Sequence, residues 1–217
     1  MLGLTPEALI IRLIVLGVGM TLHEFAHNYV AWKMGDPEPA RQGRLTLNPF
    51  VHINWLGWIM FALIGFGILG SAPISPYRMP RENRRWRWFA AVAAGPVSNL
   101  LLAIIFGLII RILGVESLVS LPNFVAQLLY QMVLWNCLLF VFNLIPLFPI
   151  DGWQLVYSML SPNLAVWWER NRQNSYYVFM GLILLSFASS WGMGLPNILG
   201  IIISQPTQAL VRLLVGF

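Results

Sequence analysis

The sequence predicts an all-α polytopic membrane protein. Three observations lead to this prediction: the composition, several long apolar segments, and ionisable residues inside one of them. Of the 217 residues, 58% are hydrophobic and only 10% are charged, and the mean hydropathy is +0.72, whereas in soluble domains about a quarter of the residues are charged. No polar stretch is long enough for a second domain, so residues 1–217 are expected to form one membrane-embedded domain.

The first part of the chain contains one span followed by an irregular region. An apolar segment at about 9–32 is long enough to cross a bilayer, which takes about 20 residues. Residues 35–54 are polar and rich in proline, and within them residues 43–48 alternate between polar and apolar as a strand does. The apolar run 55–69 is short and broken by glycines. It is therefore expected to enter and leave the membrane on the same side, as a re-entrant segment.

Two further apolar helices complete the expected core. They run over about 88–113 and 124–148, and with the first span they form a three-helix core at about 8–160. A C-terminal region at about 161–217 adds one or two spans. Its apolar runs lie near 176–191, which is the clearest, and near 198–203 and 210–217.

Arginines determine the expected orientation. They cluster at 78–87 and recur at positions 170 and 172, and basic residues in short loops stay on the cytoplasmic side. This places the N-terminus outside. The net charge of +5 indicates topology and contact with anionic lipid headgroups, not binding to nucleic acid. The N-terminal apolar run lacks the basic start of a signal peptide, so it is expected to be retained in a prokaryotic plasma membrane.

Residues 23–27 read His-Glu-Phe-Ala-His within the first span, and they are the most informative feature of the chain. Positions i and i+4 share one face of a helix, so His23 and His27 can reach the same metal ion. Glu24 is not needed as a ligand and is well placed to hold a metal-bound water. The alternative is a packed histidine pair, but ionisable groups inside a bilayer are costly and usually functional. The pattern predicts a zinc-dependent peptidase that works within the bilayer.

A catalytic zinc site needs a third protein ligand and an open fourth position for water. Asp151 is the acid expected to supply this ligand, because it follows the helix at 124–148 on the same predicted side as the two histidines. Two prolines just before it loosen the helix, and Gly152 allows the backbone to approach the site closely. The alternative is that Asp151 caps the helix that follows it.

Three motifs, in this order, resemble those of the site-2 protease family of intramembrane metalloproteases. They are the motif at 23–27, Gly-Pro-Val-Ser-Asn at 95–99, and the run 143–152, which holds the family's Asn, Pro, Asp and Gly. The resemblance covers the chain from about 10 to 160 and is to the compact branch, which has no inserted PDZ domain. His52 is expected to be structural, because a fourth protein ligand would close the zinc site.

The resemblance implies an intramembrane zinc endopeptidase whose substrate is a single-span membrane protein and whose active site faces the cytoplasm. It implies one zinc ion per chain, held by His23, His27 and Asp151. Glu24 would act as general base toward a zinc-activated water. Asn99 and Asn143 would hold the substrate backbone or the developing oxyanion; a structural hydrogen bond is the alternative for each. The oligomeric state and the cleavage sequence are not indicated.

A helical substrate must unwind before its peptide bonds become accessible, and the alternating segment 43–48 suggests how the unwound chain is held. It could supply an edge strand that pairs with the substrate. The residues expected to make this contact are Arg44, Leu45, Thr46 and Leu47.

A second class of function is a non-hydrolytic metal-binding membrane protein, such as a scaffold, sensor or transporter. The sequence has no repeated halves of the kind typical of transporters. Glu24 distinguishes the two classes, because metal binding can proceed without it and peptide hydrolysis cannot.

Overall fold

The computed structural model describes residues 5–64, 67 and 70–216, and the described part of the chain is helical. The elements in chain order are α1 Pro6–Lys33, α2 Glu38–Arg41, α3 Pro49–His52, α4 Trp55–Ile64, the 3-10 helix η1 Pro76–Arg78, α5 Arg84–Ser120, α6 Asn123–Asn143, α7 Asp151–Met159, α8 Pro162–Arg170, α9 Arg172–Ser190 and α10 Ile198–Val215. In α5, Gly114 has φ 73° and kinks the helix.

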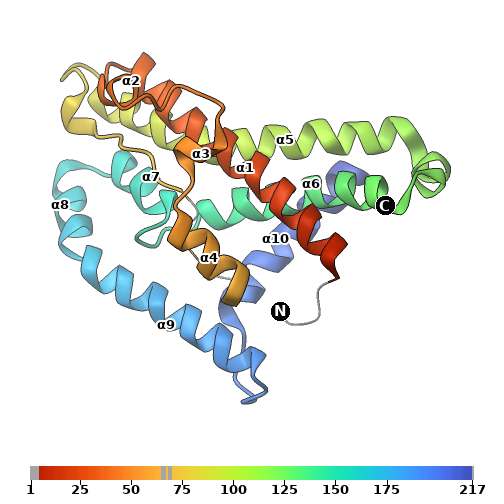
Figure 1. Cartoon of the computed structure of the whole chain (residues 1–217). Coiled ribbons are helices and arrows are strands. Elements are labelled where there is room, and N and C mark those ends of the chain that lie inside the picture. Colours follow the sequence, from red (N-terminus) through yellow and green to blue (C-terminus); the bar gives the residue numbers. More distant parts are fainter. Residues whose placement is uncertain (1–4, 65–66, 68–69, 217) are drawn as a thin grey trace.

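Within the described residues, four helices are long and apolar enough to cross a bilayer: α1, α5 as far as Gly114, α6 and α10. Figure 1 shows α1, α5 and α6 side by side, and α10 packs against both α5 and α6. The chain is therefore an all-α polytopic membrane protein, as the composition predicted, with a three-helix core and a C-terminal span.

The centre of the molecule lies where α1, α5 and α6 meet. Ile11 and Val15 of α1 pack against Met132 of α6. A second buried cluster joins α5, α6 and α10 through Ala103, Ile110, Val133, Cys137, Val211 and Val215. Lipid tails are as apolar as these side chains, so close packing holds the helices together. This packing holds α1, which carries both histidines, against α5 and α6.

The described ends of the segment between α1 and α5 lie next to each other; residues 65–66 and 68–69 of the run 55–69, which was predicted to be re-entrant, lie outside the described residues. Ile53 and Gly70 form an isolated antiparallel bridge, so the chain comes back to its starting point after α4. With 10 residues, α4 is too short to cross the bilayer. Arg87 Nη1 donates to Met34 O at 3.1 Å, which places the start of α5 beside the end of α1.

The strand predicted at 43–48 does not form; these residues make a turn and an irregular loop. Their polar groups bond locally instead of remaining free for pairing. Arg44 Nη1 donates to Val51 O at 2.7 Å, and His52 Nε2 donates to Thr46 O at 2.8 Å. The loop is thereby fastened to α3, and His52 has the structural role expected of it.

A buried carboxylate anchors the segment that follows the re-entrant part. Asp36, 0% exposed, accepts from Arg78 Nε at 2.7 Å and Nη2 at 2.9 Å, and from the amides of Glu38 and Ser75. Burial raises the pKa of Asp36, but the hydrogen bonds from Arg78 and the two amides lower it by more. This clamp fixes one end of residues 71–75, which carry no regular structure.

The boundaries of the later helices differ from the prediction. The span expected at 124–148 ends at Asn143, because Pro146 and Pro149 cannot continue a helix. The runs near 198–203 and 210–217 belong to one helix, α10, which continues through Pro206; residue 217 lies outside the described residues. The segment near 176–191 forms α9, but α9 is not among the helices apolar enough to span, because it begins with polar residues.

Candidate metal centre

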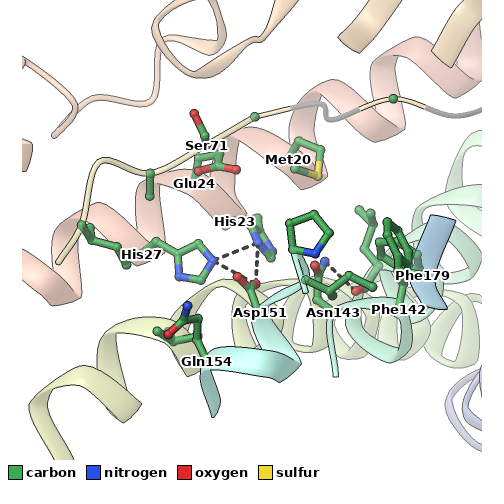
Figure 2. A pocket seen from close by; sticks show the side chains of 18 of the residues that line it. Met20, His23, Glu24, His27, Ser71, Phe142, Asn143, Asp151, Gln154 and Phe179 are labelled. Carbon is green, nitrogen blue, oxygen red and sulfur yellow. Dashed lines mark hydrogen bonds and ion pairs between the residues drawn. The ribbon is translucent and has the colours of Figure 1, made fainter. Parts of the chain in front are cut away.

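Three side chains that lie far apart in sequence converge on one point. His23 and His27 are one turn apart on α1, and their Nε2 atoms lie 3.0 Å from each other. Asp151 is the first residue of α7, and its Oδ2 lies 3.2 Å from His23 Nε2 and 3.1 Å from His27 Nε2 (Figure 2). The three residues predicted as metal ligands are therefore brought together by helices α1 and α7.

The second ring nitrogen of each histidine determines its tautomer. His27 Nδ1 lies 2.8 Å from Ala91 O, and a carbonyl oxygen can only accept. His23 Nδ1 lies 2.7 Å from Asn99 Oδ1. The amide of Asn99 is itself oriented, because its Nδ2 donates to Gly19 O at 3.1 Å and to Asn136 Oδ1 at 2.9 Å. Both Nδ1 atoms therefore carry the proton, and both Nε2 lone pairs face the convergence point.

This arrangement fits a zinc ion. Two imidazole lone pairs and a carboxylate oxygen at 3.0–3.2 Å repel one another unless a cation lies between them. Bonds of about 2.0–2.1 Å in a tetrahedral zinc site put the ligand atoms about 3.3–3.4 Å apart, close to these separations. Within the described part of the chain, no other group of three such side chains could hold a metal ion.

Gly95 on α5 makes room for the ligand atoms. A Cβ at this position would lie 2.2 Å from His27 Nε2 and 2.7 Å from His23 Nε2. Asn99 lies one turn further along the same face of α5, where it reaches His23. The motif at 95–99 thus serves the site twice, since its glycine admits the imidazoles and its asparagine orients one of them.

Asn99 was expected to contact the substrate or the oxyanion, but the structure places it behind His23 with 0% of its surface exposed. Its partner Asn136 was missed by the sequence analysis. The signal available was a polar residue at the middle of an apolar span, where such residues need a partner. Asn143, by contrast, lies on the cavity wall, and its Nδ2 donates to Leu139 O at 2.9 Å.

The ligands open onto a cavity of about 470 Å³. Figure 2 shows Glu24 on the far side of this space from Asp151, close to Ser71. Glu24 is 4% exposed, and its Oε2 has no hydrogen-bond partner among the described residues. Gly70 lets the returning segment pass this carboxylate, because a Cβ there would lie 2.7 Å from Glu24 Oε1.

The wall beside Glu24 is formed by Gly70, Ser71, Ala72 and Ile74. Residues 44–47, which were predicted to pair with a substrate strand, do not line the cavity among the described residues. On the opposite wall, Asp151 would have to bind a metal ion as the ionised carboxylate.

Comparison with curated proteins gives relatives over most of the chain. It is 36% identical over 180 residues to "Putative zinc metalloprotease YwhC" of Bacillus subtilis, covering 81% of both chains. It is 29% identical over 187 residues to "Putative zinc metalloprotease Rip2" of Mycobacterium tuberculosis, covering 82% of this chain and 68% of that protein. Rip2 of Mycolicibacterium smegmatis is 25% identical over 189 residues, which cover 80% of this chain and 66% of that protein. No family model and no solved structure matches the chain.

Proposed function

The chain belongs to the site-2 protease family of metalloproteases, and from this premise we propose that it is an intramembrane zinc endopeptidase. Its substrate is a single-span membrane protein, cut in or near the transmembrane segment. The cytoplasmic side is the side of cleavage, because the arginines at the start of α5 lie at the same end of the core as the metal ligands. The domain is a single unit over residues 1–217.

One observation carries this proposal: a buried carboxylate, with one oxygen that has no hydrogen-bond partner among the described residues, lies beside three converging metal ligands. The ligands alone would suit a structural or transport site. Glu24 is adjacent to His23 in sequence, and its Oε2 has no protein partner among the described residues. Leaving a carboxylate unpaired in this setting is costly, so its retention indicates use in proton transfer.

The chain's own residues divide the chemistry between them. His23, His27 and Asp151 hold the ion, and the tautomers set by Ala91 and Asn99 keep both Nε2 atoms available to it. A bound zinc ion would supply a Lewis acid that activates water and polarises the scissile carbonyl. Glu24 accepts a proton from the attacking water and delivers it to the leaving amine.

Two asparagines take different roles in this proposal. Asn143, on the cavity wall, holds the substrate backbone or the developing oxyanion. Asn99 acts through His23 and is a positioning residue, because it is buried away from the cavity. Ser71, Ala72 and Ile74, in a segment without regular structure, flank the route by which an unwound substrate would approach.

The test measures zinc and cleavage in the same purified preparations. We expect about one zinc per chain in the wild type and a large loss in Asp151→Ala. Glu24→Gln should keep its zinc and lose cleavage of a transmembrane substrate by about a hundredfold or more. Full cleavage by Glu24→Gln would remove this carboxylate from the mechanism. Equal zinc in the wild type and Asp151→Ala would contradict the ligand set.

A further inference from the structure

A second cavity, of about 670 Å³, lies outside the metal centre where α5 begins and α7 leads into α8. Three arginines and three aromatic side chains are prominent on its walls: Arg84, Arg85, Arg170, Tyr77, Trp88 and Tyr157. The lining also contains one acid, Glu169. Nothing in the proposed peptidase chemistry uses this cavity. Its composition, basic on one part and aromatic or apolar on the rest, suits a ligand with an anionic head and a less polar body.

The cavity lies at one boundary of the membrane. The spans α1 and α5 end and begin at this level, where Arg87 is bonded to Met34 O. Beside them, α8 has no buried residue and exposes Leu164, Val166 and Trp167. A short helix that exposes apolar side chains next to a membrane boundary is typical of the headgroup region. The open side of the cavity therefore faces lipid headgroups.

Positive charge outweighs negative charge on the walls of this cavity, where three arginines face one acid. The first turn of α5 contains arginines and no acid, although a helix N-terminus carries partial positive charge. Asn83, its N-cap residue, makes no side-chain capping bond. Arg170 has no hydrogen bond or ion pair within the described ranges, and the nearby acid Glu169 is paired with Arg172 at 3.0 Å. An anion is thus the missing partner.

Two of the arginines are held in place before any ligand arrives. Arg85 donates through Nε to Ser158 O at 3.1 Å and through Nη2 to Leu160 O. Arg84 donates through Nε and Nη2 to Met79 O at 3.2 and 2.9 Å. In each guanidinium these bonds use one edge, which leaves Nη1 for a phosphate oxygen.

We propose that this cavity binds the phosphate-bearing headgroup of an anionic phospholipid. The phosphate lies among Arg84, Arg85 and Arg170, and the glycerol and first acyl carbons lie along the apolar wall toward α8. The site contains none of the metal ligands and shares only Trp88 with the described lining of the metal cavity, so its test does not depend on the peptidase assignment.

The test compares Arg170→Gln with Arg41→Gln. Arg170 is exposed and unpaired, so its replacement leaves the fold intact, and Arg41 is an exposed arginine on α2 outside the cavity. Each full-length variant is purified in detergent, and binding of phosphatidylglycerol and of phosphatidylcholine is measured by native mass spectrometry. We expect the wild type to prefer phosphatidylglycerol, Arg170→Gln to bind it about fivefold more weakly, and Arg41→Gln to match the wild type.

Three results would overturn the proposal. Equal affinity for the two lipids would show that the site does not recognise an anionic headgroup. Equal weakening of phosphatidylglycerol binding by Arg170→Gln and Arg41→Gln would show that only the net charge of the protein matters. Displacement of phosphatidylglycerol by inorganic phosphate at millimolar concentration would assign the cavity to a soluble anion instead of a lipid.

Discussion

The two sides of the metal cavity are built in opposite ways. On the ligand side, His23 and His27 each have a second hydrogen-bond partner on α5, and Asp151 begins a helix packed against α5. On the side of Glu24, the wall is an irregular segment fastened at Gly70 by one bridge and near Ser75 by Asp36. The ligand side is preorganised for an ion, and the other side is fixed only at its ends, where a peptide chain must be admitted.

The largest effect should come from filling the space on the ligand side. Gly95→Ala would place a methyl group within 2.2 Å of His27 Nε2, so one imidazole must move. We expect zinc affinity to fall by more than about a hundredfold, the upper end of what losing a supporting partner costs. Gly17→Ala on α1 is the control, because a Cβ there meets no atom within 4 Å. Competition with a chelator measures both, and equal affinities would refute the role given to Gly95.

A smaller fall in zinc affinity should follow when one imidazole loses its second hydrogen-bond partner. Asn99→Ala removes the acceptor for His23 Nδ1, and we expect zinc affinity to fall about 10- to 100-fold. Asn136→Leu acts only through Asn99 and should cost about tenfold. The double variant should bind zinc as Asn99→Ala does, since residues in one network are not additive. Additive losses in the chelator competition would separate Asn136 from the metal centre.

Loosening the opposite wall should change substrate binding and leave zinc in place. Asp36→Asn weakens the contacts to Arg78 that fix residues 71–75. Hydrogen bonds to charged groups contribute about 1.5–3 kcal/mol, so we expect KM to rise about tenfold with little change in kcat. Glu38→Gln, at a half-buried position on α2 where the side chain accepts from Gln42, is the matched control. Loss of zinc from Asp36→Asn would show that the two sides are not independent.

The same clamp should respond to pH in a defined direction. The pKa of Asp36 is lower in the folded chain than its usual value, which is about 3.9 in unfolded peptides. Its contribution to stability is complete above that value and is lost as pH falls through the lower folded pKa. Thermal unfolding followed from pH 7 to pH 3 should therefore show a smaller decline in Asp36→Asn than in the wild type. Parallel curves would contradict this contribution.

The smallest effect on cleavage is expected from a substitution at Thr46. If this residue paired with a substrate strand, the same substitution would reduce cleavage strongly. Thr46 lies in a loop fastened to α3, away from the described lining of the cavity. Thr46→Pro should leave cleavage within about twofold of the wild type, as for most surface substitutions. A severe loss of cleavage with normal zinc would restore the pairing hypothesis.

Local periodicity explains what the sequence could predict. His23 and His27 could be predicted to face one ion because residues i and i+4 lie on the same face of a helix. Asp151 could be predicted as the third ligand because it follows directly after the end of the preceding helix. Residues 43–48 alternate between polar and apolar side chains as a strand does, but their polar groups form hydrogen bonds with nearby residues of α3. The alternation pattern gives no information about such bonds. The hydrogen bond between Asn99 and Asn136 depends on the relative position of α5 and α6 along their axes. The sequence of either helix alone does not determine that position.

The C-terminal region is a second case in which the sequence pattern did not determine the structure. The apolar runs expected separately near 198–203 and 210–217 belong to one helix, α10, which continues through Pro206. In a membrane bundle, neighbouring helices satisfy the backbone groups that proline releases, so the break expected in water does not occur. Gly95 was recognised as part of a motif, but its purpose became visible only when both imidazoles were placed against α5.

Asp151 follows His27 by 124 positions, and this separation has a consequence for biosynthesis. A ribosome completes α1 with both histidines and Glu24 long before it reaches α7. Until then the nascent chain holds two ligands, and Asn99, which orients His23, arrives with α5. Because segments fold in the order of their synthesis, the last ligand is supplied only after the helical core is in the membrane. Under the proposed function, the emerging polypeptide would therefore lack a complete metal site until α1, α5 and α6 have been made, while α10 is still to follow.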